Sequence, residues 1–151
     1  MQKAELAAKM EPVRSLQNIS GNVWWPGYAL TRNTGGVADS LVTVYQSSIA
    51  LPPASTWISA DNPVAPVGSY LEKGNVIKWD EVATVGTTSD VVRYVVYRFD
   101  DLEDVDIDSA EAIVAVTPDH QFKAERPGVY VVTALDRVNN ESAPSVALQV
   151  L

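Results

Sequence analysis

With 151 residues, the chain is long enough for one domain of ordinary size, or for a small domain with an appendage. Its hydrophobic fraction of 46% predicts a folded protein, and no apolar run reaches the roughly 18 residues of a membrane span, so no membrane span is expected. The formal net charge of −8 arises in residues 61–151, which hold seven basic and sixteen acidic groups, so binding to nucleic-acid phosphates is not expected.

Cysteine is absent, which excludes disulfides, thiol catalysis and cysteine-ligated zinc. His120 is the single histidine, so a histidine-rich metal site is excluded as well. The first residues lack the apolar core of a signal peptide. We therefore expect neither a metal nor a cofactor.

The first sixty residues predict a helix, a strand and a second helix. Apolar residues recur at helical spacing before Val13 and again from Val37 to Ile49, while Ile19 to Trp25 has the pattern of a strand. A lone strand leaves its backbone groups unpaired. This strand must therefore pair with a sandwich edge, a second copy of the chain or a missing neighbour.

The rest of the chain predicts an all-β domain. Leu51 to Pro66 holds four prolines and predicts an extended linker, so we place the domains at residues 1–60 and 61–151. Seven strands are expected: Val64–Val67, Val76–Trp79, Val91–Phe99, Ala112–Thr117, Gln121–Ala124, Tyr130–Leu135 and Val146–Leu151. This number is typical of a fibronectin type III or immunoglobulin-like β-sandwich, with Trp79 in its core.

The stretch from Tyr130 to Ser145 is the most informative part of the chain. An alternating strand (Y-x-V-x-A) runs into the turn Asp136 to Asn140, and an E-S-x-P-S segment follows. This pattern resembles the last two strands of a fibronectin type III domain. Such domains are more often spacers or binding platforms than catalysts.

Gly21 to Pro53 resembles the end of a (β/α)8 barrel in a bacterial glycoside-hydrolase-like family that carries a C-terminal fibronectin-type-III-like domain. The resemblance rests on the segments WW-x-GY, NTGG-x-ADSL and YQ, and on the closing ALDR-x-NNESAPS. It implies that Ile19 to Trp25 is the eighth barrel strand and Val37 to Ile49 the eighth helix. The catalytic carboxylates would then lie in the missing N-terminal barrel, which becomes the expected partner, and the protein would be extracellular, periplasmic or on the cell surface.

Candidate sugar-binding residues follow the predicted strand. Trp24 and Trp25 lie at its C-terminal end, where barrel sites are built, and tryptophan faces stack on sugar rings. Successive strand residues point to opposite sides, which favours Trp25, in phase with Gly21, over Trp24. Tyr28 lies in the loop that follows. The alternative is that the tryptophans are core residues and Tyr28 belongs to an ordinary polar loop.

Other polar clusters are weaker candidates. Asp104, Asp106 and Asp108 have the spacing at which a calcium loop begins, but the glycine and the distal glutamate are missing, which favours a solvated acidic loop. Asp119 and His120 have no nearby serine or cysteine partner, which favours a surface or capping histidine. No catalytic residue is expected in this chain.

Three functions compete. The first is a non-catalytic accessory or spacer region of a glycoside-hydrolase-like protein that acts on carbohydrate. The second is a carbohydrate-binding or protein-interaction module, which requires an exposed aromatic platform. The third, an independent hydrolase, lacks a carboxylate pair in the sequence. We also expect association into homo-oligomers through the 1–60 segment, because its apolar flanks would expose a large patch on a monomer.

Overall fold

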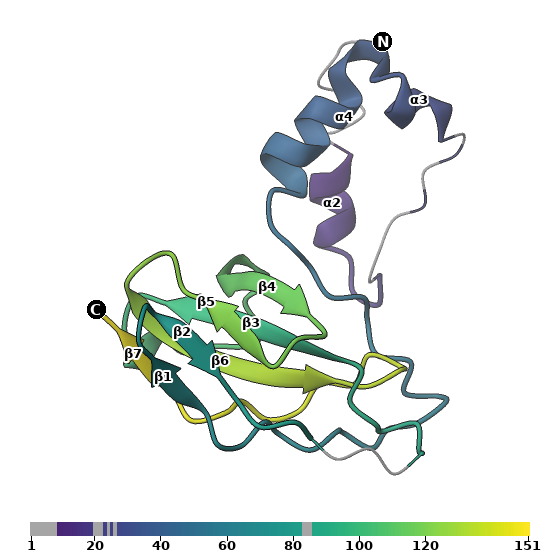
Figure 1. Ribbon diagram of the computed structural model, residues 1–151. Coiled ribbons are helices and arrows are strands. Elements are labelled where there is room, and N and C mark those ends of the chain that lie inside the picture. The colour runs from purple at the N-terminus through teal and green to yellow at the C-terminus, as the bar shows by residue number, and fades with distance from the viewer. Residues whose placement is uncertain (1–8, 20–22, 24, 26, 83–85) are drawn as a thin grey trace. The chain divides into compact units, whose positions relative to one another are not determined.

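The computed structural model describes residues 9–19, 23, 25, 27–82 and 86–151 (Figure 1). The chain divides into two compact units, an N-terminal unit from Met1 to Ser48 and a sandwich unit from Ile49 to Leu151. The sequence-based boundary was placed twelve residues later, between residues 60 and 61. The difference arises because the proline-rich segment belongs to the sandwich unit.

The N-terminal unit is built from short helices around a small apolar core. These helices are α2 (Met10–Arg14), α3 (Tyr28–Thr31), η1 (Thr34–Gly36), α4 (Val37–Ser40) and the π-helical η2 (Leu41–Tyr45). Buried Met10, Val37 and Leu41 form the core, with Leu30 and Tyr45 packed against it. Together α4 and η2 account for the predicted helix, which ends at Tyr45 rather than at Ile49.

The predicted strand from Ile19 to Trp25 falls largely outside the described residues. Its three described members, Ile19, Val23 and Trp25, are not part of a strand. Assignment of this segment to an eighth barrel strand therefore stays an expectation.

The sandwich unit contains two antiparallel sheets. One holds β1 (Tyr70–Glu72), β2 (Val76–Lys78) and β5 (Gln121–Lys123) in the order β1-β2-β5. The other holds β3 (Arg93–Phe99), β4 (Ile113–Thr117), β6 (Gly128–Leu135) and β7 (Leu148–Val150) in the order β4-β3-β6-β7. Seven strands in two antiparallel layers confirm the predicted fibronectin type III or immunoglobulin-like sandwich.

The first strand begins later in the chain than its sequence indicates. β1 starts at Tyr70, whereas Val64 to Val67 was the expected strand. Pro63 lies directly before this segment and Pro66 lies within it, both are buried, and proline cannot donate to a ladder. One trace of pairing persists there, since the Val67 carbonyl accepts a hydrogen bond from the Asp80 amide at 3.0 Å.

The four-stranded sheet is covered on both faces. Between the sheets, Val96 and Val132 pack with Ile77 and with Trp79, which is buried as predicted. On the other face, Tyr97 and its apolar neighbours pack with side chains from loops: Leu51, Val105, Ile107, Ala110, Ala112 and Ala147. Every residue of β6 is buried as a result. This explains why its sequence is apolar almost throughout rather than strictly alternating.

Serine side chains complete the last hairpin. The Ser142 amide donates to the Ala134 carbonyl, and the Ser142 hydroxyl accepts from the Ala134 amide, both at 2.9 Å. Ser145 makes the same pair of bonds with Val132, at 2.8 and 3.0 Å. The E-S-x-P-S segment therefore provides hydrogen-bond partners for the β6 amides and carbonyls where Pro144 interrupts a regular strand ladder.

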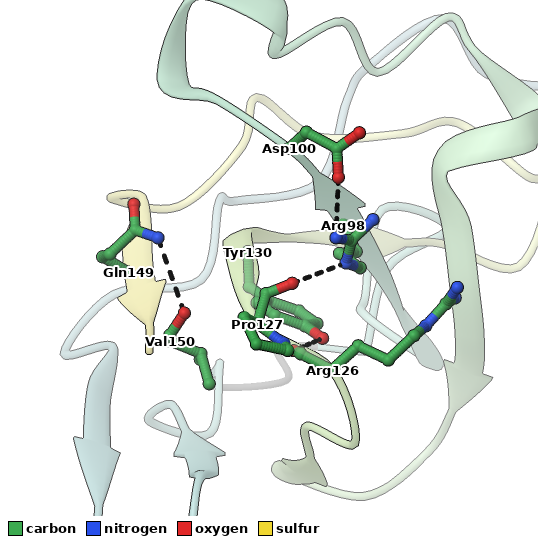
Figure 2. A network of polar contacts seen from close by, with 7 residues as sticks. All are labelled: Arg98, Asp100, Arg126, Pro127, Tyr130, Gln149 and Val150. Carbon is green, nitrogen blue, oxygen red and sulfur yellow. Dashed lines mark hydrogen bonds and ion pairs between the residues drawn. The ribbon is translucent and has the colours of Figure 1, made fainter.

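A tyrosine corner fixes the turn from β5 to β6. The Tyr130 hydroxyl donates to the Arg126 carbonyl at 2.7 Å, and Arg98 donates from Nε to the Pro127 carbonyl at 2.8 Å (Figure 2). Arg98 also forms an ion pair with Asp100 at 2.7 Å. A tyrosine hydrogen-bonded to the backbone a few residues upstream is a feature of immunoglobulin-like sandwiches. The β5–β6 connection is thereby tied to strand β3.

Candidate functional site

The proline-rich segment at the start of the sandwich unit is fastened to the rest of the sandwich. Buried Asp136 accepts hydrogen bonds from the amides of Val138 and Asn140, both at 2.8 Å, and from the Asn140 side chain at 2.9 Å. The same Asn140 amide group donates to the carbonyls of Ser59, at 3.0 Å, and Asp61, at 3.2 Å. Hydrogen bonds from the β6–β7 turn therefore attach the proline-rich segment to the sandwich.

Two further contacts attach the earlier residues of this segment to the sandwich. The Ser55 amide donates to the Val138 carbonyl at 2.8 Å, and Leu51 packs against the apolar outer face of the four-stranded sheet. The prolines of Leu51 to Pro66 predicted an extended linker here. In the structure the segment from Leu51 to Asp61 is part of the domain, and we call it the fastened segment.

The predicted sugar-binding residues lie at the surface of the N-terminal unit. Trp25 exposes 92% of its surface and Tyr28 exposes 57%. Tyr28 begins α3, and the Arg32 guanidinium lies over its ring at 5.6 Å from the centroid. Trp24 lies outside the described residues, so its position relative to Trp25 is not part of this description.

A groove lies at one end of the three-stranded sheet. It has a volume of about 510 Å³ and is lined by Tyr70, Lys78, Trp79, Asp80, Pro118, Asp119, His120 and Gln121. Lys78 pairs with both Tyr70 and Gln121 in the strand register, so these three side chains form one row on the outer face. The remaining residues come from the end of β2 and the β4–β5 turn. We call this feature the Tyr70 groove.

Positive and negative charges, and hydrogen-bond donors and acceptors, line the Tyr70 groove. The ammonium of Lys78 forms an ion pair with Glu72 at 3.0 Å, and this hydrogen bond raises the pKa of Lys78. Gly68 has a φ of 64°, and a Cβ there would overlap the Asp80 carboxylate. A residue without a side chain at this position therefore leaves room for Asp80.

Two rings of the groove lining, Trp79 and His120, each pack against the ring of Tyr94. Trp79 and Tyr94 meet edge to face at 5.3 Å between centroids, and Tyr94 meets His120 at the same distance. Trp79 is only 4% exposed, yet its indole N–H has no hydrogen-bond partner among the described residues. A buried donor without a partner is uncommon and calls for a specific explanation.

A second polar cavity lies on the outer face of the other sheet. It has a volume of about 230 Å³ and is bordered by Leu51, Tyr97, Ile107, Asp108 and Glu141, among others. The hydroxyls of Tyr97 and Thr133 both donate to Oε1 of Glu141, at 2.7 and 2.5 Å. Burial, followed by the hydrogen bond to Glu141, raises the pKa of Tyr97. This cluster joins β3, β6 and the E-S-x-P-S segment.

The acidic segment from Asp104 to Asp108 presents its aspartates to solvent. Asp104, Asp106 and Asp108 are solvent-exposed, and Oδ1 of Asp106 accepts a hydrogen bond from the Asp108 amide at 3.0 Å. Across the described ranges, His, Asp and Glu side chains form no group of three or more that could hold a metal ion. In the same part of the chain, every helix is too short or too polar to cross a membrane.

Sequence reasoning did not find the Tyr70 groove. In the sequence, Asp119 and His120 stand as an isolated pair, because Asp80 lies about forty residues earlier in the chain. Backbone pairing between β2 and β5 brings them together, and the Trp79 amide donates to the His120 carbonyl at 3.2 Å. The available signal was the pairing of the second and fifth strands that a sandwich of this type implies.

Two solved structures resemble the chain in part. One is the crystal structure of domains A168-A170 from titin, with 16% identity, a TM-score of 0.39, and coverage of 59% of this chain and 32% of the other. The second is titin kinase with its flanking domains, with 17% identity, a TM-score of 0.39, and coverage of 59% and 17%. The chain thus corresponds to a third or less of the length of either. No family model and no curated protein matches it.

Proposed function

We propose that the chain is the non-catalytic C-terminal accessory region of a glycoside-hydrolase-like protein, and that its sandwich orients the part of the protein that precedes it. The fastened segment is the observation that supports this most directly. Asn140 holds the segment before β1 against the sandwich through the carbonyls of Ser59 and Asp61, so this part of the chain is ordered within the sandwich unit. A flexible proline-rich tether would not be ordered in this way.

The N-terminal unit is the proposed contact with the preceding barrel. Its three-residue buried core leaves large apolar side chains at the surface, among them Val23, Trp25, Tyr28, Val42 and Val44. Exposed apolar groups of this extent favour burial against another surface. The resemblance of Gly21 to Pro53 to the end of a barrel indicates that the neighbouring barrel elements would provide that surface.

Two measurements test this proposal. The coding sequence on the 5′ side of Met1 should continue in frame and encode further strand–helix repeats. The chain alone should show no turnover of aryl glycosides or of soluble polysaccharides. A stop codon directly upstream of Met1, or hydrolysis by the isolated chain, would contradict the proposal.

A second candidate function is a carbohydrate-binding module. The observation that favours it is the Tyr70 groove, which combines a half-exposed aromatic ring with hydrogen-bonding groups of both kinds. Here the sandwich would contact the polysaccharide directly while the barrel acts on it.

A further inference from the structure

We propose that the Tyr70 groove binds a neutral sugar unit of a polysaccharide, with the Tyr70 ring as the stacking platform. This inference rests on the second candidate function above and assigns its site. Tyr70 is 49% exposed on the outer face of β1, so part of its ring is open to a ligand. A pyranose ring presents a face of C–H groups, which packs on an aromatic ring, and a rim of hydroxyls.

The size of the groove suits a short saccharide. Its volume of about 510 Å³ lies within the roughly 300–1,000 Å³ of small-molecule sites. Residues from β1, β2, β5 and the β4–β5 turn line it, so the paired strands hold most of its walls in place. Such a site is largely formed before its ligand arrives, which reduces the entropic cost of binding.

The polar groups select a neutral ligand. Asp80 and Asp119 accept hydrogen bonds from hydroxyls and repel anions. Lys78 donates and carries a positive charge that its ion pair with Glu72 maintains, while the Gln121 amide both donates and accepts. A simple cation would be repelled by the Lys78 ammonium and would not use the N–H donors of the Gln121 amide. A polyhydroxylated neutral ligand can use every one of these groups.

Trp79 supplies an internal reporter for the groove. It belongs to the lining, it is buried, and its indole N–H has no partner among the described residues. An indole N–H is sensitive to a change in its surroundings. Its resonance, assigned with the Trp79→Phe variant, should therefore move when the groove is filled.

The test is an NMR titration of the full chain labelled with ¹⁵N. Cellobiose, xylobiose, maltose and chitobiose would each be added to about 50 mM, which reveals even millimolar dissociation constants. At least one of these sugars should shift the Trp79 indole resonance and the backbone amides of Asp80 and His120. The exposed Trp25 and Trp57 indoles should not move together with them.

Three variants make the test specific. Tyr70→Ala should weaken binding by at least about tenfold because the stacking platform is lost, while Tyr70→Phe keeps the ring and should retain the wild-type affinity within about threefold. Trp57→Ala removes an aromatic residue that is 81% exposed on the same unit, and it should leave binding unchanged. The amide spectra of all three variants would confirm that each is folded.

Several results would overturn the proposal. The first is an unmoved Trp79 resonance with every sugar, and the second is a set of shifts confined to Trp25 or Trp57. The third is a Trp79 shift with tetramethylammonium or a lysine-rich peptide but with no sugar, which would identify a cation site instead. None of these results affects the spacer function, which is tested by the reading frame, the absence of turnover and the fastened segment.

Discussion

Tyr97 shows how one side chain can fill an apolar cluster with its ring and form a hydrogen bond with its hydroxyl. Its ring lies within the outer apolar cluster, parallel to the Phe99 ring at 6.3 Å, while its hydroxyl donates to Glu141. The partner carboxylate comes from a segment forty-four positions away, so the bond links β3 to the start of the E-S-x-P-S segment. The hydroxyl is therefore held in its neutral, donating form.

This arrangement predicts a loss of stability at alkaline pH. The pKa of Tyr97 is raised in the folded protein, whereas an unfolded tyrosine titrates near pH 10. The stabilisation is therefore complete below about pH 10 and falls as the pH rises further, because only the unfolded chain can ionise there. Urea unfolding followed between pH 8 and pH 11 measures this fall in the free energy of unfolding.

The Tyr97→Phe variant provides the comparison. It should lose about 1 kcal/mol of stability at pH 7, because the hydrogen bond to Glu141 is gone, and its alkaline decline should be shallower. A residual decline is expected because burial also raises the pKa of Tyr94. An alkaline profile of the variant as steep as that of the parent protein would refute the assignment.

Gly128 is required by a close backbone approach at the start of β6. Its φ is 145°, and a Cβ would lie 2.6 Å from the Phe99 carbonyl oxygen. Gly128→Ala should therefore destabilise the sandwich by about 2–4 kcal/mol, since backbone atoms have to move. Gly74→Ala is the matched control, because its φ of 90° imposes similar strain but nothing lies within 4 Å of the added Cβ.

Thermal or urea unfolding of both variants separates the two effects. Gly74→Ala should cost about 1 kcal/mol, which is the strain alone. Equal losses in the two variants would show that the contact with Phe99 is unimportant.

At the scale of elements, the last hairpin both closes the sheet and holds the fastened segment. Asn140 can do this because Asp136 orients its side chain and is itself buried within the turn. One asparagine therefore connects two parts of the sandwich unit: the turn after β6 and the segment before β1.

Asn140→Ala should lower the free energy of unfolding by about 1–3 kcal/mol, because the carbonyls of Ser59 and Asp61 and the Asp136 carboxylate lose a donor. Hydrogen exchange should become faster at the Ser55 amide, which reports whether the segment stays docked. Asn62→Ala, at an exposed neighbouring position, is the control and should change neither measurement. Unchanged exchange at Ser55 in the Asn140 variant would contradict the fastening.

The outer apolar face of the four-stranded sheet makes a related prediction about fragments. A fragment of residues 49–151 contains Leu51, Ser55 and Ser59 and should fold cooperatively. A fragment of residues 61–151 lacks them, leaves part of the face around Tyr97 uncovered, and should be less stable by about 2 kcal/mol or more. Guanidinium unfolding compares the two, and equal stabilities would restore the boundary expected from the prolines.

At the scale of the whole molecule, the two units differ in how fully they bury their apolar residues. The sandwich unit has two apolar clusters, one on each face of its larger sheet, whereas the described residues of the N-terminal unit form a core of three buried side chains. The surplus of exposed apolar side chains in the N-terminal unit favours association.

We expect the chain to associate with itself when no other partner is present. Sedimentation velocity should show a weight-average coefficient that rises with concentration. Trp25→Asp, at a side chain that is almost fully exposed, should move the midpoint of this rise to at least about tenfold higher concentration. Val146→Asp places the same charge on an exposed residue of the sandwich and should have no effect. A coefficient independent of concentration would rule out this association.

The sequence by itself determined the β-sandwich, its closing hairpin and the core position of Trp79. These features depend on local alternation, turn residues and aromatic placement, which can be recognised within a dozen residues of one another. The helix after Gly36 was predictable for the same reason, because the period of its apolar residues is visible within the segment.

Only the tertiary structure decided what surrounds those elements. The Tyr70 groove gathers residues from two distant segments through the β2–β5 pairing, and no local pattern marks such a meeting. Asn140 and Ser59 are likewise eighty-one positions apart. The four prolines around Ser59 resemble a linker in sequence, because proline content reports on chain stiffness and not on the hydrogen bonds that distant residues provide. The same long-range packing covers the second face of the sheet and makes β3 and β6 apolar on both sides.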